Sequence, residues 1–319
     1  MALAIMCSGG DAPGMNAAVK KFVDYCFDRG EEPWLIYDGL EGLIDGRLKK
    51  ADHHDVAGIL HRGGSVIRSS RSERFYDYAY RKQAYENLQK HGIDGLVVLG
   101  GDGSFRAMDR LSDEFSLNFV GIPTTIDNDI YGTEYCLGVD TALNTIRCSL
   151  DKIYDTASTF NRAFVVEVMG RECGYLAAIS AISSGAEICI IPEVDFNLPV
   201  IERKLKYEIE NGRRYILAIV AEGTKMTEKV AGWLEMELGF ETRVTILGHV
   251  QRGGSPTTYD RMMGFEFVVE AVDHLMRSKD LNKVVVWNKG EFGLLDIDTV
   301  VSNKYRLSPH HLSMLNILD

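Results

Sequence analysis

The chain has 319 residues, of which 46 are acidic and 35 basic, so its formal net charge is −11. The length predicts about two domains, and a composition of 45% hydrophobic and 25% charged residues is typical of globular proteins. These figures exclude a disordered chain, a coiled coil and a small disulfide scaffold. The acidic excess argues against nucleic-acid binding by bulk charge, whereas a small phosphate ligand needs only a local basic cluster.

Short apolar runs typical of buried strands alternate along the chain with helical patterns. The predicted strands are residues 2–6, 33–37, 95–99, 119–122, 163–168, 187–191, 215–221, 243–247 and 283–287. The predicted helices include residues 16–29, 81–91, 141–156, 175–184, 199–210, 228–238 and 259–278. This alternation predicts an α/β fold with two doubly wound, mostly parallel sheets, that is, two Rossmann-like domains.

The sequence predicts neither a targeting segment nor a membrane span. The apolar stretch at residues 2–6 is too short for a signal-peptide core or a membrane span. Six cysteines are scattered without a CxxC pair, which favours reduced thiols. We therefore expect a cytoplasmic protein without a membrane or nucleic-acid partner.

Two glycine-rich loops directly follow predicted strands. Residues 8–16 read SGGDAPGMN and lack both the GxGxxG pattern of dinucleotide-binding oxidoreductases and the lysine of a Walker A loop. Residues 100–105 read GGDGSF, where Ser104 can cap the next helix and Asp102 offers a carboxylate to Mg²⁺. Glycines before a helix N-terminus favour phosphate binding, although a tight turn with a helix cap has the same pattern.

Residues 123–129 read PTTIDND and hold two carboxylates, Asp127 and Asp129, with Thr125 close by. One such carboxylate can accept the proton of a substrate hydroxyl during phosphoryl transfer. An Asx turn that caps a helix is the alternative.

Arginines accompany several further strand ends, and arginine binds phosphate oxygens with two parallel hydrogen bonds. A single arginine of this kind is more often part of a surface ion pair, but their joint arrangement indicates phosphate binding. The residues concerned are Arg171, Glu222, His249 and Arg252 in loops after strands, and Arg162 and Arg243 before strands.

The segments SGGDAPGMNA, LGGDGS, IPTTIDNDI, VEVMGR, AEG and LGHVQRGGSP resemble, in order and spacing, the loops of the short bacterial ATP-dependent 6-phosphofructokinases. The resemblance covers essentially the whole chain. It implies a glycolytic kinase that transfers the γ-phosphoryl of ATP to the 1-hydroxyl of fructose 6-phosphate, with Mg²⁺, giving fructose 1,6-bisphosphate and ADP. It also implies a homotetramer whose sites are shared across subunits. The active site would lie in the cleft between a nucleotide domain (1–138 with 251–305) and a sugar-phosphate domain (139–250 with 306–319).

The resemblance further implies a role for each matching residue. Asp127 is the general base, and Thr125, Asp129 and Arg171 surround the transferring phosphoryl group. Substrate contacts come from Thr125, Asp127, Met169, Gly170, Arg171, Glu222, His249 and Arg252, joined by Arg162 and Arg243 of a neighbouring subunit. Nucleotide contacts come from Gly10, Arg71, Ser72, Gly101, Asp102, Gly103 and Ser104, and Asp102 organises Mg²⁺.

Two positions bear on the phosphoryl donor. Pyrophosphate-dependent relatives typically carry Asp in place of Gly103 and Lys in place of Thr124, and an Asp would crowd and repel the α-phosphate of a nucleotide. The sequence thus favours ATP. A pyrophosphate-dependent enzyme, a non-catalytic nucleotide-sensing subunit and other sugar-phosphate acceptors stay open as alternatives.

An effector site for ADP or phosphoenolpyruvate is the last element that the resemblance implies. Three positions where arginine is usual in that site hold Asp24, His53 and Tyr154, which predicts weak, altered or absent regulation. The remaining effector candidates are Lys20, Gly185, Glu187, Arg213 and Arg214.

Overall fold

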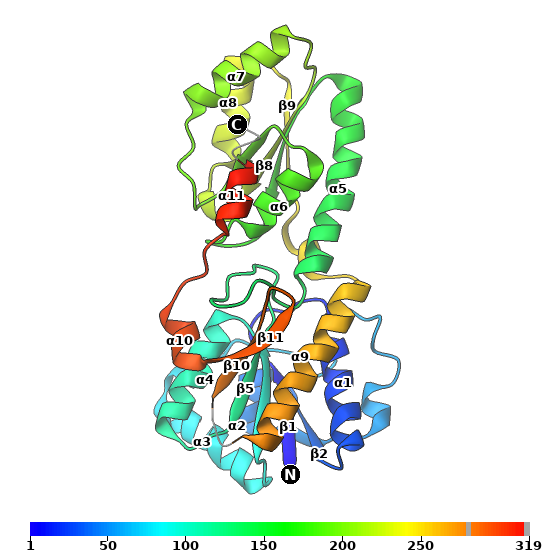
Figure 1. The fold of residues 1–319 in the computed structure, drawn as a ribbon, viewed down its shortest axis with the longest axis vertical. Helices are drawn as coiled ribbons and strands as arrows, with labels where there is room; N and C mark the ends of the chain where they lie inside the picture. The colour runs from blue at the N-terminus through cyan, green and yellow to red at the C-terminus, as the bar shows by residue number, and fades with distance from the viewer. Residues whose placement is uncertain (279–281, 316–319) are drawn as a thin grey trace. The chain divides into compact units, whose positions relative to one another are not determined.

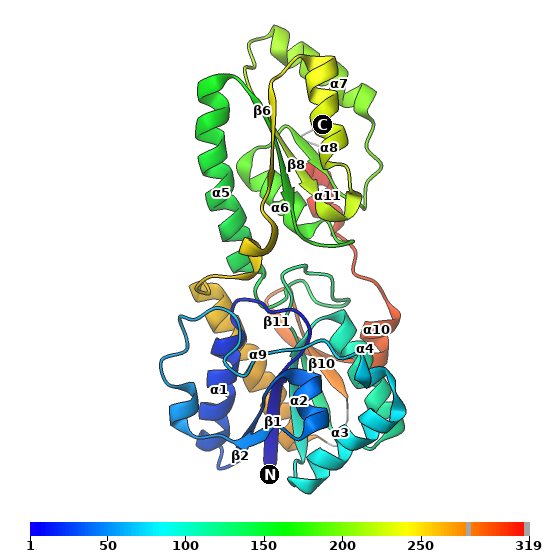
Figure 2. The same ribbon diagram turned by 180° about the vertical axis from the view of Figure 1, so that it is seen from behind.

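The computed structural model describes residues 1–278 and 282–315, and these fall into two compact units (Figures 1 and 2). Unit 1 comprises residues 1–126, 130–141 and 252–304, and unit 2 comprises residues 127–129, 142–251 and 305–319. The chain therefore passes between the units several times. Residues 279–281 of the predicted nucleotide domain and 316–319 of the predicted sugar-phosphate domain lie outside the described residues.

Unit 1 is built on a seven-stranded sheet in the order β11-β10-β5-β4-β1-β2-β3. Its strands are β1 (Ala2–Cys7), β2 (Glu32–Ile36), β3 (Leu48–Lys50), β4 (Gly95–Gly100), β5 (Phe119–Pro123), β10 (Lys283–Asn288) and β11 (Glu291–Asp296). Its helices are α1 (Met15–Asp28), α2 (Gly39–Asp45), α3 (Tyr78–Lys90), α4 (Asp102–Glu114), α9 (Thr258–Arg277) and α10 (Ile297–Ser302). Strands β1, β2, β4, β5 and β10 pair in parallel, and the edge strands β3 and β11 are antiparallel.

The burial of these strands explains why the sequence predicts them. Every residue of β4 and β5 is buried, as expected for central strands of a parallel sheet that is covered by helices on both faces. The edge strand β11 is exposed along most of its length. Helices α1 and α9 lie side by side on one face of the sheet, although they are far apart in the sequence (Figure 1).

Unit 2 holds a four-stranded parallel sheet in the order β7-β8-β6-β9. Its strands are β6 (Ala163–Val168), β7 (Ile188–Ile190), β8 (Ile216–Ala221) and β9 (Thr242–Ile246). Its helices are α6 (Tyr175–Ser184), α7 (Leu198–Glu210), α8 (Thr227–Leu238) and α11 (Pro309–Leu315), together with most of α5 (Val139–Phe160), which begins in unit 1. The predicted fold class, two mainly parallel sheets with helices, is confirmed.

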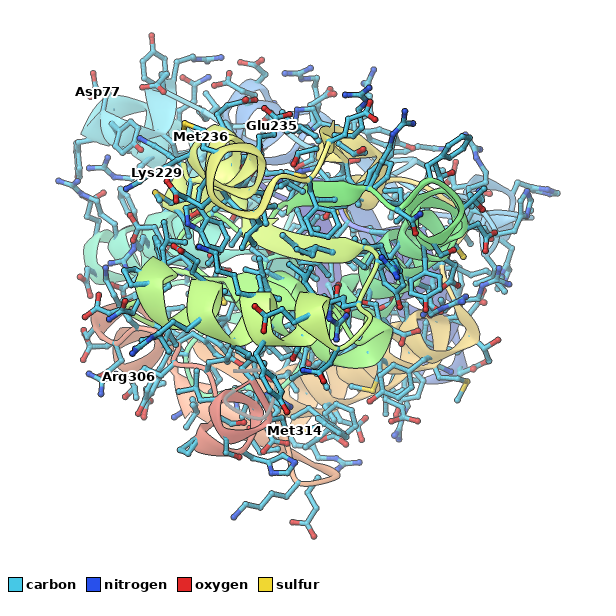
Figure 3. All side chains as sticks on the ribbon, turned by 90° about the horizontal axis from the view of Figure 1, so that it is seen from above. Asp77, Lys229, Glu235, Met236, Arg306 and Met314 are labelled. Atoms are coloured by element: carbon cyan, nitrogen blue, oxygen red, sulfur yellow. The ribbon has the colours of Figure 1, made fainter. Side chains whose placement is uncertain are left out.

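Helix α8 shows how amphipathic packing builds unit 2. Trp233 and Leu234 join the buried cluster formed by β6, β7 and β8. Met236 and Lys229 lie on the outer side of the helix, and Met236 is 78% exposed (Figure 3). In the described part of the chain, no helix is long and apolar enough to cross a membrane. All six cysteines are free thiols, in line with their scattered spacing.

Asp260, in the first turn of α9, organises the polar interior of unit 1. Its carboxylate is fully buried and accepts hydrogen bonds from the amides of Gly138 (2.7 Å) and Thr141 (2.8 Å) and from the hydroxyls of Thr141 (2.5 Å) and Tyr135. Burial raises the pKa of Asp260, while these hydrogen bonds lower it. The carboxylate thus ties the start of α9 to the segment that follows β5 and to the start of α5.

We expect Asp260→Ala to destabilise unit 1 by about 3 kcal/mol or more, because several buried donors lose their acceptor at about 1–3 kcal/mol each. The melting temperature should fall by roughly 6–12 °C on that basis, measured by circular dichroism. The matched control is Asp273→Ala on the same helix, which removes the ion pairs with Arg29 and Arg277 and one hydrogen bond from the Tyr25 hydroxyl. Equal melting temperatures for the two variants would contradict the role given to Asp260.

Candidate functional site

The two glycine-rich loops of unit 1 lie side by side because they follow neighbouring parallel strands. Cys7 at the end of β1 pairs with Leu99 of β4, and the Ser8 amide donates to the Leu99 carbonyl at 2.8 Å. The carboxyl ends of parallel strands meet at one edge of a sheet, which is where α/β proteins bind ligands. The structure thereby brings together the two loops that the sequence singles out.

Ser104 does not have the structural role that the sequence predicts for it. Gly101, not Ser104, is the N-cap of α4, and no side chain caps that helix. The Ser104 hydroxyl instead donates to Ser8 Oγ at 2.9 Å, buried between the two loops. A Cβ on Gly100 would lie only 2.6 Å from the Ser104 Cβ, so this crossing of the loops requires glycine. The prediction that Ser104 caps the helix is therefore wrong.

Two helices begin at these loops. Helix α1 starts after Gly14, and α4 starts after Gly101. The first amides of a helix have no partner within it, and the helix dipole adds partial positive charge at that end. This edge of unit 1 therefore has the properties of an anion site, and its free backbone suits phosphate oxygens.

Asp102 is the acidic residue nearest to these helix ends in the sequence. It opens α4, is half-exposed, and forms an ion pair with Arg106 at 2.8 Å. Among the described residues, no group of three or more His, Cys, Asp or Glu side chains could hold a metal ion. A single carboxylate still fits Mg²⁺, which is commonly bound by one or two carboxylates together with substrate phosphates and water.

Two further segments of unit 1 adjoin the glycine loops. The Thr124 amide donates to the Gly100 carbonyl at 2.8 Å, which places the start of the Thr124–Thr125 pair beside α4. On the other side, Gly9 N donates to Ser70 O at 3.3 Å, and Ser69 Oγ donates to Gly9 O at 2.9 Å. The loop that carries Arg71 and Ser72 is thus attached to the first glycine loop.

Arg252 lies against Gly10 within unit 1. A Cβ on Gly10 would be 2.3 Å from the Arg252 Nη1 atom, and that atom lies 3.5 Å from the Asp11 carbonyl. The sequence predicts Arg252 as a sugar-phosphate ligand together with His249, which is an exposed residue of unit 2. In the structure, the guanidinium group covers the first glycine loop.

In unit 2, the predicted base Asp127 lies beside Arg171. The Asp127 side chain is 2% exposed and that of Arg171 51%, and Asp127 Oδ2 is 3.3 Å from Arg171 Nε. The sulfur of Cys173 contacts the carbonyl of Asn128 at 3.8 Å, which connects the segment 127–129 to the loop after β6. A buried carboxylate next to a partly exposed guanidinium group suits proton transfer beside an anionic ligand.

The loops after β6 and β8 hold each other in place. Arg171 has a left-handed backbone (φ 53°), and its amide donates to Glu222 Oε1 at 2.9 Å. A Cβ on Gly223 would lie 1.7 Å from the Arg171 carbonyl oxygen. Because Val168 pairs with Ala221 across the sheet, the two loops start at the same edge. The candidates Met169, Gly170, Arg171 and Glu222 are therefore neighbours.

Gln251 is a residue that the sequence analysis missed. It is fully buried, and its Oε1 accepts a hydrogen bond from the Met169 amide at 3.2 Å, while its Nε2 donates to the Gly248 carbonyl at 2.9 Å. Gln251 thereby joins the segment after β9 to the loop after β6. A buried glutamine between His249 and Arg252 is not marked by any periodic pattern in the sequence.

Arg162 and Arg243 do not lie at the carboxyl edge of the unit 2 sheet, where Arg171 is found. Arg162 Nε pairs with Glu241 at 2.8 Å, and Arg243 pairs with the same carboxylate. Both arginines lie at the amino ends of β6 and β9, and β6 has six residues, so roughly 20 Å of strand separates them from the edge with Arg171. The expected gathering of arginines near one site therefore does not occur within a single chain.

The effector candidates are divided between the units. In unit 2, Glu187 pairs with Arg213, which also pairs with Glu208 at 2.6 Å. Burial raises the pKa of Glu187, against the lowering effect of its hydrogen bond from the Leu217 amide and of Arg213. Arg214 is exposed, and Gly185 ends α6. Lys20 lies in α1 of unit 1 and pairs with Asp24 at 2.8 Å.

Comparison with known proteins shows the family of this chain. The phosphofructokinase family matches residues 2–275. The chain belongs to this family. It is 56% identical over 313 residues to the ATP-dependent 6-phosphofructokinase of Sulfurovum sp. strain NBC37-1, an alignment that spans 98% of this chain and 95% of that one. It is 55% identical over 315 residues to the enzyme of the same name from Sulfurimonas denitrificans, with 98% of both chains covered.

Solved phosphofructokinase structures have the same fold. The phosphofructokinase of Saccharomyces cerevisiae matches with a TM-score of 0.88 and 36% identity, over 94% of this chain. This chain spans 45% of that larger one. A pyrophosphate-dependent phosphofructokinase from Marinobacter aquaeolei matches with a TM-score of 0.85 at 18% identity, over 97% of this chain and 86% of that one, which is a likeness of fold alone.

We expect Gly223→Ala to displace Arg171 in this phosphofructokinase, because the added Cβ overlaps the Arg171 carbonyl oxygen. Phosphoryl transfer should fall by about 100-fold or more, since misplacement by about 1 Å has effects of this size. The control is Gly232→Ala on α8, where a Cβ meets only the end of the Met236 side chain at 3.9 Å. Full activity of the Gly223 variant in a coupled assay would argue against the loop contact as a constraint.

Proposed function

We propose that the chain is an ATP-dependent 6-phosphofructokinase, which transfers the γ-phosphoryl group of ATP to the 1-hydroxyl of fructose 6-phosphate. The observation that carries this proposal is the buried Asp127 carboxylate beside Arg171. Only Ile126 separates it in the chain from Thr125, the neighbour of the second glycine loop. The relatives with 55–57% identity that bear this name support the same conclusion.

Asp127 acts as the general base. It takes the proton of the sugar 1-hydroxyl as the hydroxyl oxygen attacks the γ-phosphorus, and the bond from that phosphorus to the bridging oxygen breaks to release ADP. Arg171 offsets the negative charge of the transferring group, and Thr125 and Asp129 border it. Little covalent chemistry is required of the protein, so positioning and charge neutralisation supply most of the rate.

Unit 1 binds the nucleotide. The helix N-termini after Gly14 and Gly101 hold phosphate oxygens through backbone amides, and Arg71 adds a positive charge. Gly10, Ser72, Gly103 and Ser104 complete the predicted set. Asp102 and the nucleotide phosphates would hold Mg²⁺, which would supply positive charge against the β- and γ-phosphates.

Unit 2 binds the sugar phosphate through Met169, Gly170, Glu222 and His249, and Arg252 is assigned to the same ligand. We assign Arg162 and Arg243 to the sugar site of a neighbouring copy in a homotetramer. Their position at the opposite strand ends, paired to Glu241, supports this assignment because they cannot reach Arg171 of their own chain. As predicted, we place this glycolytic enzyme in the cytoplasm.

The donor preference is tested with Gly103→Asp. A Cβ on Gly103 meets nothing within 4 Å, so the variant should fold normally. We expect the parent to use ATP and fructose 6-phosphate with little or no activity on pyrophosphate. The variant should lose about tenfold or more in kcat/KM for ATP, equivalent to about 1.4 kcal/mol. A coupled assay with each donor measures both, and pyrophosphate-only turnover by the parent would overturn the proposed donor.

The variant Asp127→Ser tests the assignment of Asp127 as the general base. We expect kcat to fall by about 10²–10⁴-fold, the usual contribution of a general base, while KM for fructose 6-phosphate changes little. Asp151→Asn is the control, since it removes only an exposed ion pair with Arg147 on α5. Steady-state kinetics of the purified variants decide the matter, and near-normal turnover of Asp127→Ser would rule out the assignment.

A further inference from the structure

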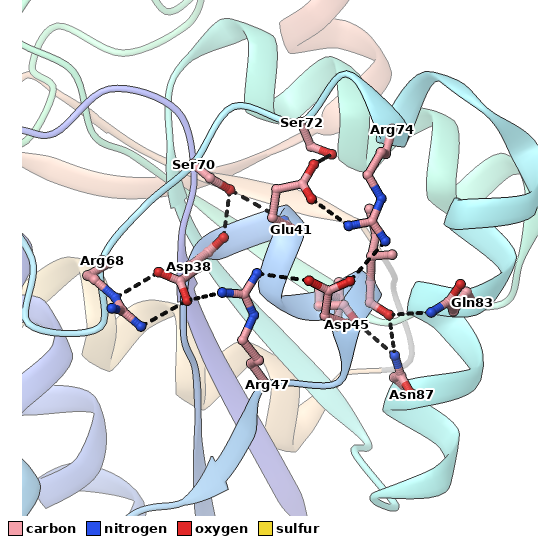
Figure 4. Close-up of polar contacts among 12 residues, drawn as sticks. Asp38, Glu41, Asp45, Arg47, Arg68, Ser70, Ser72, Arg74, Gln83 and Asn87 are labelled. Carbon is pink, nitrogen blue, oxygen red and sulfur yellow. Dashed lines mark hydrogen bonds and ion pairs between the residues drawn. The ribbon is translucent and has the colours of Figure 1, made fainter.

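A continuous network of charges joins α2 to the loop that precedes α3 (Figure 4). Its centre is Glu41, whose carboxylate accepts hydrogen bonds from the Ser72 hydroxyl and, at 2.8 Å, from Arg74 Nη1. Arg74 Nη2 reaches Asp45 at 2.9 Å, so this guanidinium group bridges two carboxylates of one short helix. The hydrogen bond between them raises the pKa of Arg74 and lowers that of Asp45.

The network continues on the other side of α2. Arg47 bridges Asp45 (3.0 Å) and Asp38, and Arg68 pairs with Asp38 at 2.7 Å. The Ser70 hydroxyl donates to the Asp38 carbonyl at 2.6 Å. Figure 4 shows these side chains on both sides of α2, so the loop from Arg68 to Arg74 is attached to this helix at both of its ends.

Arg71 lies in the middle of this loop and differs from the arginines around it. Arg68 and Arg74 are paired with carboxylates. Arg71 is exposed, and within residues 1–278 and 282–315 it takes part in no hydrogen bond or ion pair. Because Arg47, Arg68 and Arg74 occupy the carboxylates of Asp38, Glu41 and Asp45, the Arg71 cation remains available to a ligand.

The loop is also attached to the first glycine loop through Ser69, Ser70 and Gly9. The network therefore fixes Arg71 and Ser72 between α2 and the backbone that we assign to the nucleotide phosphates. We propose that Glu41 and Arg74 are positioning residues for the donor nucleotide, acting through Ser72 and Arg71. This inference rests on the proposed function of unit 1.

The effect of Glu41→Gln on ATP binding distinguishes a purely electrostatic role of Glu41 from a positioning role. Removing a negative charge near a phosphate site should strengthen ATP binding if only charge matters. If Glu41 holds the loop through Ser72 and Arg74, Glu41→Gln should weaken ATP binding instead. Arg74→Gln should weaken it as well, since Glu41 and Asp45 then compete for Arg71.

The experiment compares Glu41→Gln, Arg74→Gln and Arg74→Lys with the parent. Lys49→Gln is the matched control, because it removes one cation from an exposed ion pair with Asp55 in the same unit. ATP binding is measured by titration calorimetry without sugar, and both KM values and kcat are measured by coupled assay. The Glu41–Arg74 pair is only partly buried, and surface ion pairs contribute about 1 kcal/mol or less to stability, so we expect all variants to melt close to the parent.

We expect Kd and KM for ATP to rise about fivefold to tenfold in Glu41→Gln and Arg74→Gln, within the range of a lost charge-assisted hydrogen bond. KM for fructose 6-phosphate and kcat should stay within about twofold, and Arg74→Lys should recover part of the ATP affinity. The double variant Glu41→Gln/Arg74→Gln should be no worse than the more affected single variant, because both act in one network.

Unchanged or tighter ATP binding by Glu41→Gln would overturn the inference, and so would an equal rise of both KM values. In either case the parent still phosphorylates fructose 6-phosphate with ATP, and the proposed function stands. A parent that neither binds ATP nor turns over would instead overturn the proposed function together with this inference.

Discussion

Close contact between loops at the carboxyl ends of parallel strands is the constraint on which both units depend. In unit 1, Gly100 leaves room for Ser104, and in unit 2, Gly223 leaves room for the Arg171 carbonyl. Parallel pairing places these ends at one edge of the sheet and therefore crowds the loops that follow. Crowding limits the conformations that each loop can adopt, and the polar side chains on the loops are fixed as a result. The glycines of this acidic chain thus serve the site as directly as its arginines do.

Most of the charged side chains discussed above are paired within the chain. The formal net charge of −11 leaves enough carboxylates to pair many arginines. Arg162 and Arg243 share Glu241, and Arg74 bridges Glu41 and Asp45. Arg71 has no such partner in the described part of the chain, and the side chain of Arg171 is half-exposed above a buried Asp127. Local pairing of the other arginines leaves Arg71 available to an anionic ligand, since an arginine bound to a carboxylate competes poorly for phosphate.

The sequence predicts the regular elements of this fold well, because buried parallel strands are short, continuous apolar runs bounded by turn residues, whereas the helices are longer and amphipathic. All nine predicted strands are present within one residue at each end. The edge strands β3 and β11 were not predicted, since β3 has three residues and β11 is mostly exposed. Side-chain partners were harder to predict: the bond from Ser104 to Ser8 spans 96 positions and that from Met169 to Gln251 spans 82. Contacts of this range depend on the packing of strands, which no local pattern records.

The backbone at Arg171 and Asn128 adopts a conformation that residues other than glycine rarely adopt. Both residues have φ near 53°, in the left-handed region that costs a residue other than glycine of order 1 kcal/mol or more. Asparagine tolerates this region through local hydrogen bonds, whereas arginine has no such compensation. The bond from the Arg171 amide to Glu222 and the tight contact with Gly223 hold Arg171 in this conformation. An extended backbone at Arg171 would avoid the strain but would redirect its side chain. The fold retains the strained conformation, in which the guanidinium group of Arg171 lies 3.3 Å from the carboxylate of Asp127.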